Sequence, residues 1–195
     1  METYIIIGGI CAVLLVGIHF LRSYLSGTKC LLRQRLDGKV IVLICESLDL
    51  ASIPSIKNFA ERLSQREPVI HMLINNAGVM IADFELTEYG FEKNMGVNHL
   101  GHFLLTHLLI PRLCAASGAK VINVSSDSHY FSRINIRDLN KPMHGSYYAH
   151  SKLAMVIHAR ELSRRYANQG LTAVSLHPGL VGTELFRQSN IYNAS

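Results

Sequence analysis

The fold of this chain of 195 residues follows from residues 69–78, VIHMLINNAG. Val69–Ile74 is a short apolar run, typical of a strand buried in a parallel sheet. Asn75–Gly78 ends that run with polar and small residues, as a turn does. Similar apolar runs occur at residues 39–44, 120–124 and 171–176.

Helical spacing fills the intervals between these runs. The predicted helices cover Ser52–Gln65, with Pro54 in the first turn, Thr87–Cys114, with Thr87 as cap, and Gly145–Asn168, stopped at Gly170. Strands and helices therefore alternate. The sequence predicts an α/β fold: a doubly wound parallel sheet with helices on both faces.

Composition excludes several classes of protein. Hydrophobic residues make up 49% of the chain and charged residues 17%, which excludes intrinsic disorder. The four cysteines show no paired spacing, which argues against a disulfide framework or a zinc knuckle. Residues 1–40 hold +3 of the total charge of +5, and no basic run follows, so nucleic acid is not an expected partner.

The N-terminal segment is apolar on every side. Residues 3–21 carry no formal charge, and a helix of that length spans about 28 Å, enough for the core of a bilayer. Basic residues follow the run rather than precede it, which favours an uncleaved anchor over a signal peptide. We therefore expect residues 1–35 to be a membrane anchor with a basic flank, and the rest to face the cytosol.

The most informative motif joins a tyrosine and a lysine. Tyr148 and Lys152 are four residues apart and so share one face of the predicted helix. A phenol titrates near ~10, and a neighbouring ammonium favours the phenolate and lowers that pKa. Such a phenol can exchange a proton with a substrate oxygen. Tyr147 has no lysine in the matching position, because Ser151 stands there. Taken alone, the spacing also fits an ordinary exposed helix face.

Other candidate residues follow the predicted strands. Ser126 ends one strand, Asn76–Gly78 follows another, and Pro178–Thr183 follows the last. In parallel sheets, ligands bind beyond the carboxyl ends of the strands. Each segment alone reads as a turn, but their joint occurrence indicates a site. Ser126 lacks the Gly-x-Ser-x-Gly context of a hydrolase nucleophile, and no metal site is expected at His99, His102 and His107, because no carboxylate motif accompanies them.

At this point the sequence resembles the short-chain dehydrogenase/reductases. The matching motifs are Asn75-Asn-Ala-Gly78, Val97-Asn98, Val124-Ser-Ser126, Tyr148-x-x-x-Lys152 and Pro178-Gly179. Longer strings, such as LINNAGVM and LHPGLVGTEL, are similar to the membrane-anchored retinol dehydrogenases. The resemblance runs from Gly38 to about Leu185 and implies a Rossmann-like domain over residues 36–195.

The resemblance also implies roles. Tyr148 would transfer the proton, Lys152 would lower the pKa of Tyr148 and hold the nicotinamide ribose, Ser126 would polarise the substrate oxygen, and Asn98 would hold a water near Lys152. The implied cofactor is NADP(H) or NAD(H). Its implied contacts, besides Tyr148 and Lys152, are Asp49, Asn75, Asn76, Ala77, Gly78, Pro178, Gly179, Val181 and Thr183.

Two departures from the family pattern stand out. The family's glycine-rich turn for the cofactor pyrophosphate follows its first strand, but here Cys45-Glu-Ser47 stands there, and no glycine occurs between Gly38 and Gly78. A βαβ unit needs about 30 residues, yet only four separate Ile44 from Asp49. After Leu185 only ten residues remain, where the family continues into a segment that covers the substrate. We expect an incomplete, truncated Rossmann-like sheet with impaired cofactor binding.

Two functional hypotheses result. The first is a retinol dehydrogenase-like, NAD(P)-dependent oxidoreductase of hydrophobic alcohols and carbonyls. The second is a non-catalytic, membrane-anchored interaction or dimerisation module. The expected partners are a retinoid-like small molecule, membrane lipid through residues 3–21, and a second copy of the chain. The resemblance implies the endoplasmic reticulum membrane, with the mitochondrial membrane as the alternative.

Overall fold

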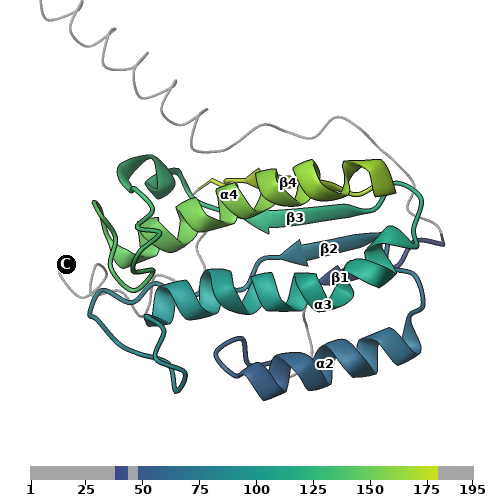
Figure 1. The fold of residues 1–195 in the computed structure, drawn as a ribbon, viewed down its shortest axis with the longest axis horizontal. Coiled ribbons are helices and arrows are strands. Elements are labelled where there is room, and N and C mark those ends of the chain that lie inside the picture. Colours follow the sequence, from purple (N-terminus) through teal and green to yellow (C-terminus); the bar gives the residue numbers. More distant parts are fainter. Residues whose placement is uncertain (1–37, 44–47, 180–195) are drawn as a thin grey trace, which may run out of the picture. The chain divides into compact units, whose positions relative to one another are not determined.

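The computed structural model describes residues 38–43 and 48–179. Four strands form one parallel sheet in the order β1-β2-β3-β4 (Figure 1). Their bounds are β1 Ile41–Leu43, β2 Met72–Asn75, β3 Lys120–Val124 and β4 Thr172–Leu176. All four predicted strands are confirmed, although β2 begins three residues later than predicted and includes Asn75.

Three longer helices connect these strands: α2 Ile53–Arg66, α3 His102–Cys114 and α4 Tyr147–Tyr166. A π-helical turn, η1 Met95–Gly101, leads directly into α3, and short 3-10 turns lie at η2 Asp127–Phe131 and η3 Ala167–Gln169. The side chain of Ser146 caps α4 by accepting a hydrogen bond from the Ala149 amide at 3.1 Å. Gly170, with a φ of 78°, ends the last turn as predicted.

The helix predicted to begin at Thr87 begins later. Thr87 lies in a tight turn, in which the Gly90 amide donates to the Thr87 carbonyl and the Phe91 amide donates to the Thr87 hydroxyl. Gly90 adopts a φ of 77°, a left-handed conformation that a helix cannot continue through. Thr87 is therefore a turn residue, and the prediction that it caps the helix is wrong.

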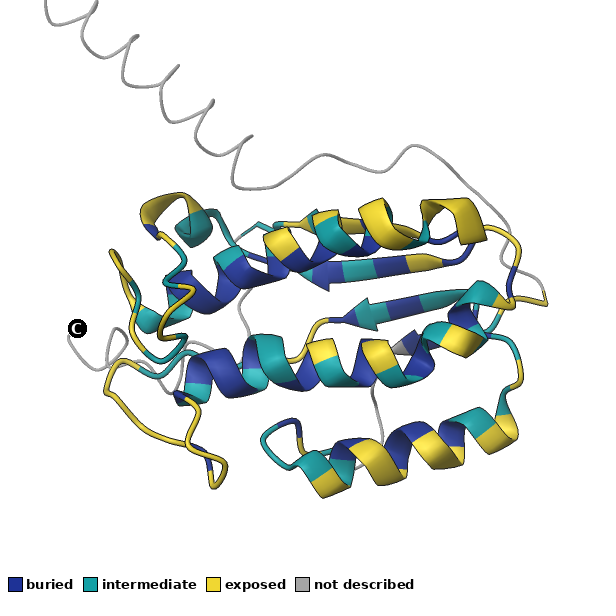
Figure 2. Cartoon of the chain, viewed as in Figure 1, coloured by how far each residue is buried: buried dark blue, intermediate teal, exposed yellow. Residues whose placement is uncertain are grey.

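The helices of the described part pack against one face of the sheet only. Strand side chains alternate between the two faces, and Val42, Leu73, Val121 and Ala173 stand in one register row. That row is buried in a single core cluster with residues of α2, α3 and α4 (Figure 2). On the opposite face Ile41 is 40% exposed and Val174 is 48% exposed. The prediction of helices on both faces is therefore wrong for the residues described, because α2, α3 and α4 all contribute to this one core cluster.

The predicted membrane anchor, residues 3–21, lies outside the described residues. Among the residues that are described, no helix is both long and apolar enough to cross a bilayer.

Candidate active site

The carboxyl ends of the parallel strands bring the predicted motifs to one edge of the sheet. Beyond β3, the Ser125 amide donates to the Leu176 carbonyl at 2.8 Å, which prolongs the pairing with β4. The Ser125 hydroxyl donates to the Lys152 carbonyl at 2.8 Å and so fastens α4 to this edge. Ser126 and the first turns of α4 are thereby held together.

Tyr148, Ser126 and Lys152 form the centre of the site. The side chain of Ser126 lies close enough to the Tyr148 phenol to influence its pKa. Lys152 Nζ lies 5.5 Å from the centre of the Tyr148 ring and donates to the Val124 carbonyl at 3.0 Å. Lys152 is only 4% exposed, and among the described residues no carboxylate pairs with its ammonium group. The motif predicted from a four-residue spacing is thus assembled around a buried cation.

The pKa values differ from the prediction. Burial raises the pKa of Tyr148 above its usual value, and the nearby Ser126 side chain acts in the opposite direction. Burial also lowers the pKa of Lys152, to about 8. The expectation that Lys152 lowers the pKa of Tyr148 is not met, because the ammonium lies over the ring and is bonded to a carbonyl. The phenol therefore keeps its proton at neutral pH.

Gly78 passes close to both Lys152 and Asn98. A Cβ atom at Gly78 would lie 3.0 Å from Asn98 Oδ1 and 3.5 Å from Lys152 Nζ. Asn98 is fully buried on η1, and its amide holds the next residue of the loop at both backbone groups: Oδ1 accepts from the Val79 amide at 2.7 Å and Nδ2 donates to the Val79 carbonyl at 2.9 Å. The structure thus brings Gly78, Asn98 and Lys152 together.

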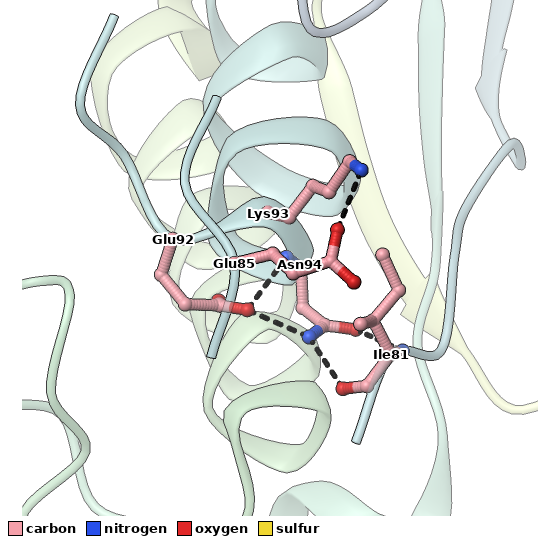
Figure 3. A network of polar contacts seen from close by, with 5 residues as sticks. All are labelled: Ile81, Glu85, Glu92, Lys93 and Asn94. Carbon is pink, nitrogen blue, oxygen red and sulfur yellow. Dashed lines mark hydrogen bonds and ion pairs between the residues drawn. The ribbon is translucent and has the colours of Figure 1, made fainter. Parts of the chain in front are cut away.

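A second asparagine, four residues earlier, makes the same pair of hydrogen bonds to the loop backbone. Asn94 Oδ1 accepts from the Ile81 amide at 3.0 Å, and its Nδ2 donates to the Ile81 carbonyl at 2.9 Å (Figure 3). Four residues of helix rise about 6 Å and two residues of extended chain span about 6.6 Å. Asn94 and Asn98 can therefore bind Ile81 and Val79, which lie two residues apart on one extended segment. The two side chains hold the backbone of this segment as a neighbouring strand would. We call these two residues the asparagine pair.

The buried carboxylate of Glu92 holds Asn94, one member of the asparagine pair, at the start of the helix. Its Oε1 accepts from the Asn94 amide at 2.9 Å and from Asn94 Nδ2 at 2.7 Å, and its Oε2 accepts from the Met95 amide at 2.8 Å (Figure 3). A carboxylate at this position satisfies amides that the helix leaves without partners. An exposed ion pair between Lys93 and Glu85, at 2.7 Å, lies beside the network.

We expect Glu92→Ala to lower the free energy of unfolding by about 1.5–3 kcal/mol, because three buried donors lose a charged acceptor. Exposed Glu88 is the matched control, and Glu88→Ala should change the free energy by less than about 0.5 kcal/mol. Urea denaturation of the two variants measures both values. Equal effects would show that the Glu92 network contributes nothing of its own.

The predicted contacts to the adenosine side lie in different surroundings. Exposed Asp49 accepts from the Ala51 amide at 2.8 Å, in the turn before α2. Asn75 is buried, and its Nδ2 donates to Thr106 Oγ1 at 3.0 Å and to Asn123 Oδ1 at 2.8 Å, so its side chain joins β2, β3 and α3. Asn76 and Ala77 are exposed.

The last predicted segment is described only in part. Pro178 is exposed, and Gly179 has a φ of 83°, which favours glycine. Val181 and Thr183 lie outside the described residues. A cavity of about 160 Å³ has an apolar lining that includes Leu50, Phe91 and Leu104. Neither Tyr148 nor Lys152 lines it.

Several residues of the site were not found from the sequence. Ser151 accepts from Asn98 Nδ2 at 3.0 Å and donates to the Tyr148 carbonyl at 2.7 Å, so it connects η1 to α4. Asn123 donates to the Met155 carbonyl at 3.0 Å. One signal was present for Asn123: asparagine is rare inside strands, so its place within the apolar run 120–124 indicates a buried polar contact.

Comparisons with known proteins agree with this geometry. A family model described as short chain dehydrogenase matches residues 32–193. Human retinol dehydrogenase 12 is 43% identical over 173 residues, which are 87% of this chain and 55% of that protein. Human retinol dehydrogenase 13 is 46% identical over 152 residues, 76% of this chain and 46% of that protein. The chain thus spans about half the length of the curated relatives it matches.

Solved structures are also similar to this chain. An uncharacterised protein from Mycobacterium paratuberculosis matches with a TM-score of 0.61 and 42% identity, over 72% of this chain and 52% of that chain. NADPH-bound carbonyl reductase from chicken fatty liver matches with a TM-score of 0.54 and 28% identity, over 71% of this chain and 58% of that chain. The chain therefore belongs to the short-chain dehydrogenase family, and within it the chain is similar to the retinol dehydrogenases.

Proposed function

We propose that this chain carries the proton-transfer centre of an NAD(P)-dependent oxidoreductase that acts on hydrophobic alcohols and carbonyls. The observation that carries the proposal is that Tyr148 and Ser126 lie together beside the buried ammonium of Lys152, which pairs with no carboxylate among the described residues. An unpaired charge is rarely buried without a functional reason. The retinol dehydrogenases that the chain resembles support the substrate class.

The side chains divide the chemistry among them. Ser126 donates a hydrogen bond to the substrate oxygen and so polarises the carbonyl. Tyr148 gives its proton to that oxygen as the carbonyl becomes an alcohol, and the phenolate left behind regains a proton from solvent. The nicotinamide, when bound, supplies or accepts the hydride. Carbonyl reduction requires the protonated phenol, and burial of Tyr148 disfavours its phenolate form.

The residues present fit one half of a dinucleotide. Gly78 leaves open the space beside Asn98 and Lys152 that a Cβ atom would enter, and Lys152 can donate to a ribose hydroxyl there. Asn98 uses its side chain on Val79 and Ser151, so a water near Lys152 would have to be held by other atoms. The pyrophosphate half is not matched by sequence, because residues 39–77 contain no glycine. We therefore infer that NADP(H) binds weakly.

Weak binding can be tested with the full chain in detergent micelles. NADPH is titrated while its fluorescence is followed, and we expect no saturation below millimolar concentrations. Saturable binding in the micromolar range would contradict weak binding. The matched control is Gly78→Val: any binding that uses this site should disappear in the variant, because its side chain enters the space beside Lys152.

The chain's surroundings are part of the proposal. Residues 3–21 would anchor it in a membrane, where retinoid-like substrates dissolve, with residues 36–195 as the partial catalytic domain facing the cytosol. We place it at the endoplasmic reticulum, with the mitochondrial membrane as the alternative. A homodimer belongs to the same proposal. Membrane flotation of the full chain, compared with a chain lacking residues 1–35, would test the anchor.

A second candidate function is a non-catalytic, membrane-anchored interaction or dimerisation module. One observation favours it: β1 is followed by Leu48 after only four residues, with no glycine-rich turn. This candidate predicts a cooperative thermal melt together with no NADPH binding and no turnover. Measurable carbonyl reduction would exclude it.

A further inference from the structure

The first turn of α3 contains an unusual exchange of hydrogen-bond donors. In an α-helix the amide of residue 102 would donate to the carbonyl of residue 98. Here the His102 amide donates to the His99 carbonyl. The Asn98 carbonyl lies 3.0 Å from Nδ1 of the His102 ring instead. The imidazole of His102 thus replaces its own backbone amide as the donor to the Asn98 carbonyl. This exchange occurs where the wider η1 turn meets α3.

The geometry fixes the state of this ring. A carbonyl oxygen only accepts, so Nδ1 must carry the proton and Nε2 must be the bare nitrogen. His102 is fully buried, and burial lowers its pKa to about 4, although the hydrogen bond to Asn98 raises it somewhat. The nearby Lys152 and His158 also act against a charged ring. The imidazole therefore serves as a neutral donor at physiological pH.

The bond matters because of what Asn98 holds. The side chain of Asn98 makes hydrogen bonds of 2.7 and 2.9 Å to the backbone of Val79, next to Gly78 and Lys152. A side chain that inserts into the i→i−4 ladder is a known cause of a widened or bent helix turn. We propose that His102 is a positioning residue: its Nδ1–H holds the widened turn open, and this keeps Asn98 in register with the Gly78–Val79 loop beside Lys152. The consequence for catalysis rests on the proposed function, but the positioning itself does not.

The test is amide hydrogen exchange on the full chain in detergent micelles. In His102→Leu, we expect the Val79 amide to exchange at least 10-fold faster, while Val121 in β3 changes much less. His102→Asn should restore protection, because its Nδ2 sits at the branch position of Nδ1 and also donates. The matched control is His99→Leu, which removes a ring whose Nδ1 is buried without a partner among the described residues. That variant should leave Val79 protected.

Two outcomes would overturn the proposal. One is a loss of protection at Val79 that merely equals the loss at Val121, since this would reflect general destabilisation. The other is equal behaviour of His99→Leu and His102→Leu. If His102→Leu fails to fold, nitrogen-15 NMR of the wild-type imidazole decides: we expect the Nδ1–H tautomer at pH 7, and an Nε2–H tautomer would refute the bond to Asn98. A chain that shows no turnover would defeat the proposed function and leave these results unaffected.

Discussion

Tyr148→Phe is expected to reduce the turnover of a hydrophobic aldehyde with NADPH by about 10³-fold, the range typical of a lost general acid. Phenylalanine keeps the ring beside Lys152 but removes the hydroxyl that lies near Ser126. The loss should appear in kcat more than in KM, because the missing interaction develops as the proton moves. The measurement is NADPH oxidation by the full chain in detergent micelles, at saturating aldehyde.

The neighbouring tyrosine provides the control. Tyr147 precedes Tyr148 on α4, and its ring packs against Phe84 with 5.6 Å between centroids. Tyr147→Phe removes the same hydroxyl from the same turn of helix, and we expect it to leave turnover within about 2-fold of wild type, since surface changes of this kind have small effects. Turnover that survives in Tyr148→Phe would assign proton transfer to another group.

Lys152→Met is expected to change how stability depends on pH. The pKa of Lys152 is about 8 in the folded chain, against an ordinary value of 10.5. Between these two pH values the unfolded chain binds more protons than the folded chain, so the stability of the wild type should rise with pH across that window. The shift corresponds to a burial penalty of about 3 kcal/mol at neutral pH. The variant has no such group and should not show the rise.

Denaturation of the wild type and Lys152→Met at pH 7 and pH 10 measures this difference. We expect the wild type to gain about 2–3 kcal/mol relative to the variant between the two pH values. Loss of the bond to the Val124 carbonyl offsets part of the variant's advantage at pH 7, by about 1 kcal/mol. Exposed Lys120 is the control, and Lys120→Met should follow the wild-type curve. Parallel curves for wild type and Lys152→Met would show that the ammonium carries no burial penalty.

Local sequence signals predicted what depends on local physics. Lys120–Val124 was predicted at its observed bounds, because a β-branched apolar run buried in a parallel sheet needs no other information. The neighbourhood of Tyr148 and Lys152 followed from helical spacing alone. By contrast, the helix predicted over Thr87–Cys114 begins later than its threonine indicates, because Gly90 adopts a left-handed conformation that no local periodicity predicts.

Contacts between segments that lie far apart in the sequence could not be predicted from such local signals. The asparagine pair binds the backbone of Val79 and Ile81, which lie 19 and 13 residues away in the sequence. No periodicity in the sequence predicts which extended segment lies beside a helix. The pKa of Tyr148 was expected in the wrong direction for the same reason. Spacing placed Lys152 near the ring but could not reveal that the Val124 carbonyl draws its ammonium to one side.

The sheet face that the described helices leave uncovered affects how much of this protein the cell retains. Ile41, Val174 and Leu176 are each at least 40% exposed on strands whose other face is packed. Chaperones and proteases recognise a folded chain partly by the absence of such apolar strand surface. We therefore expect the abundance of this chain to be set by quality control at this face, so that a substitution such as Val174→Thr would raise its steady-state level without touching the active site.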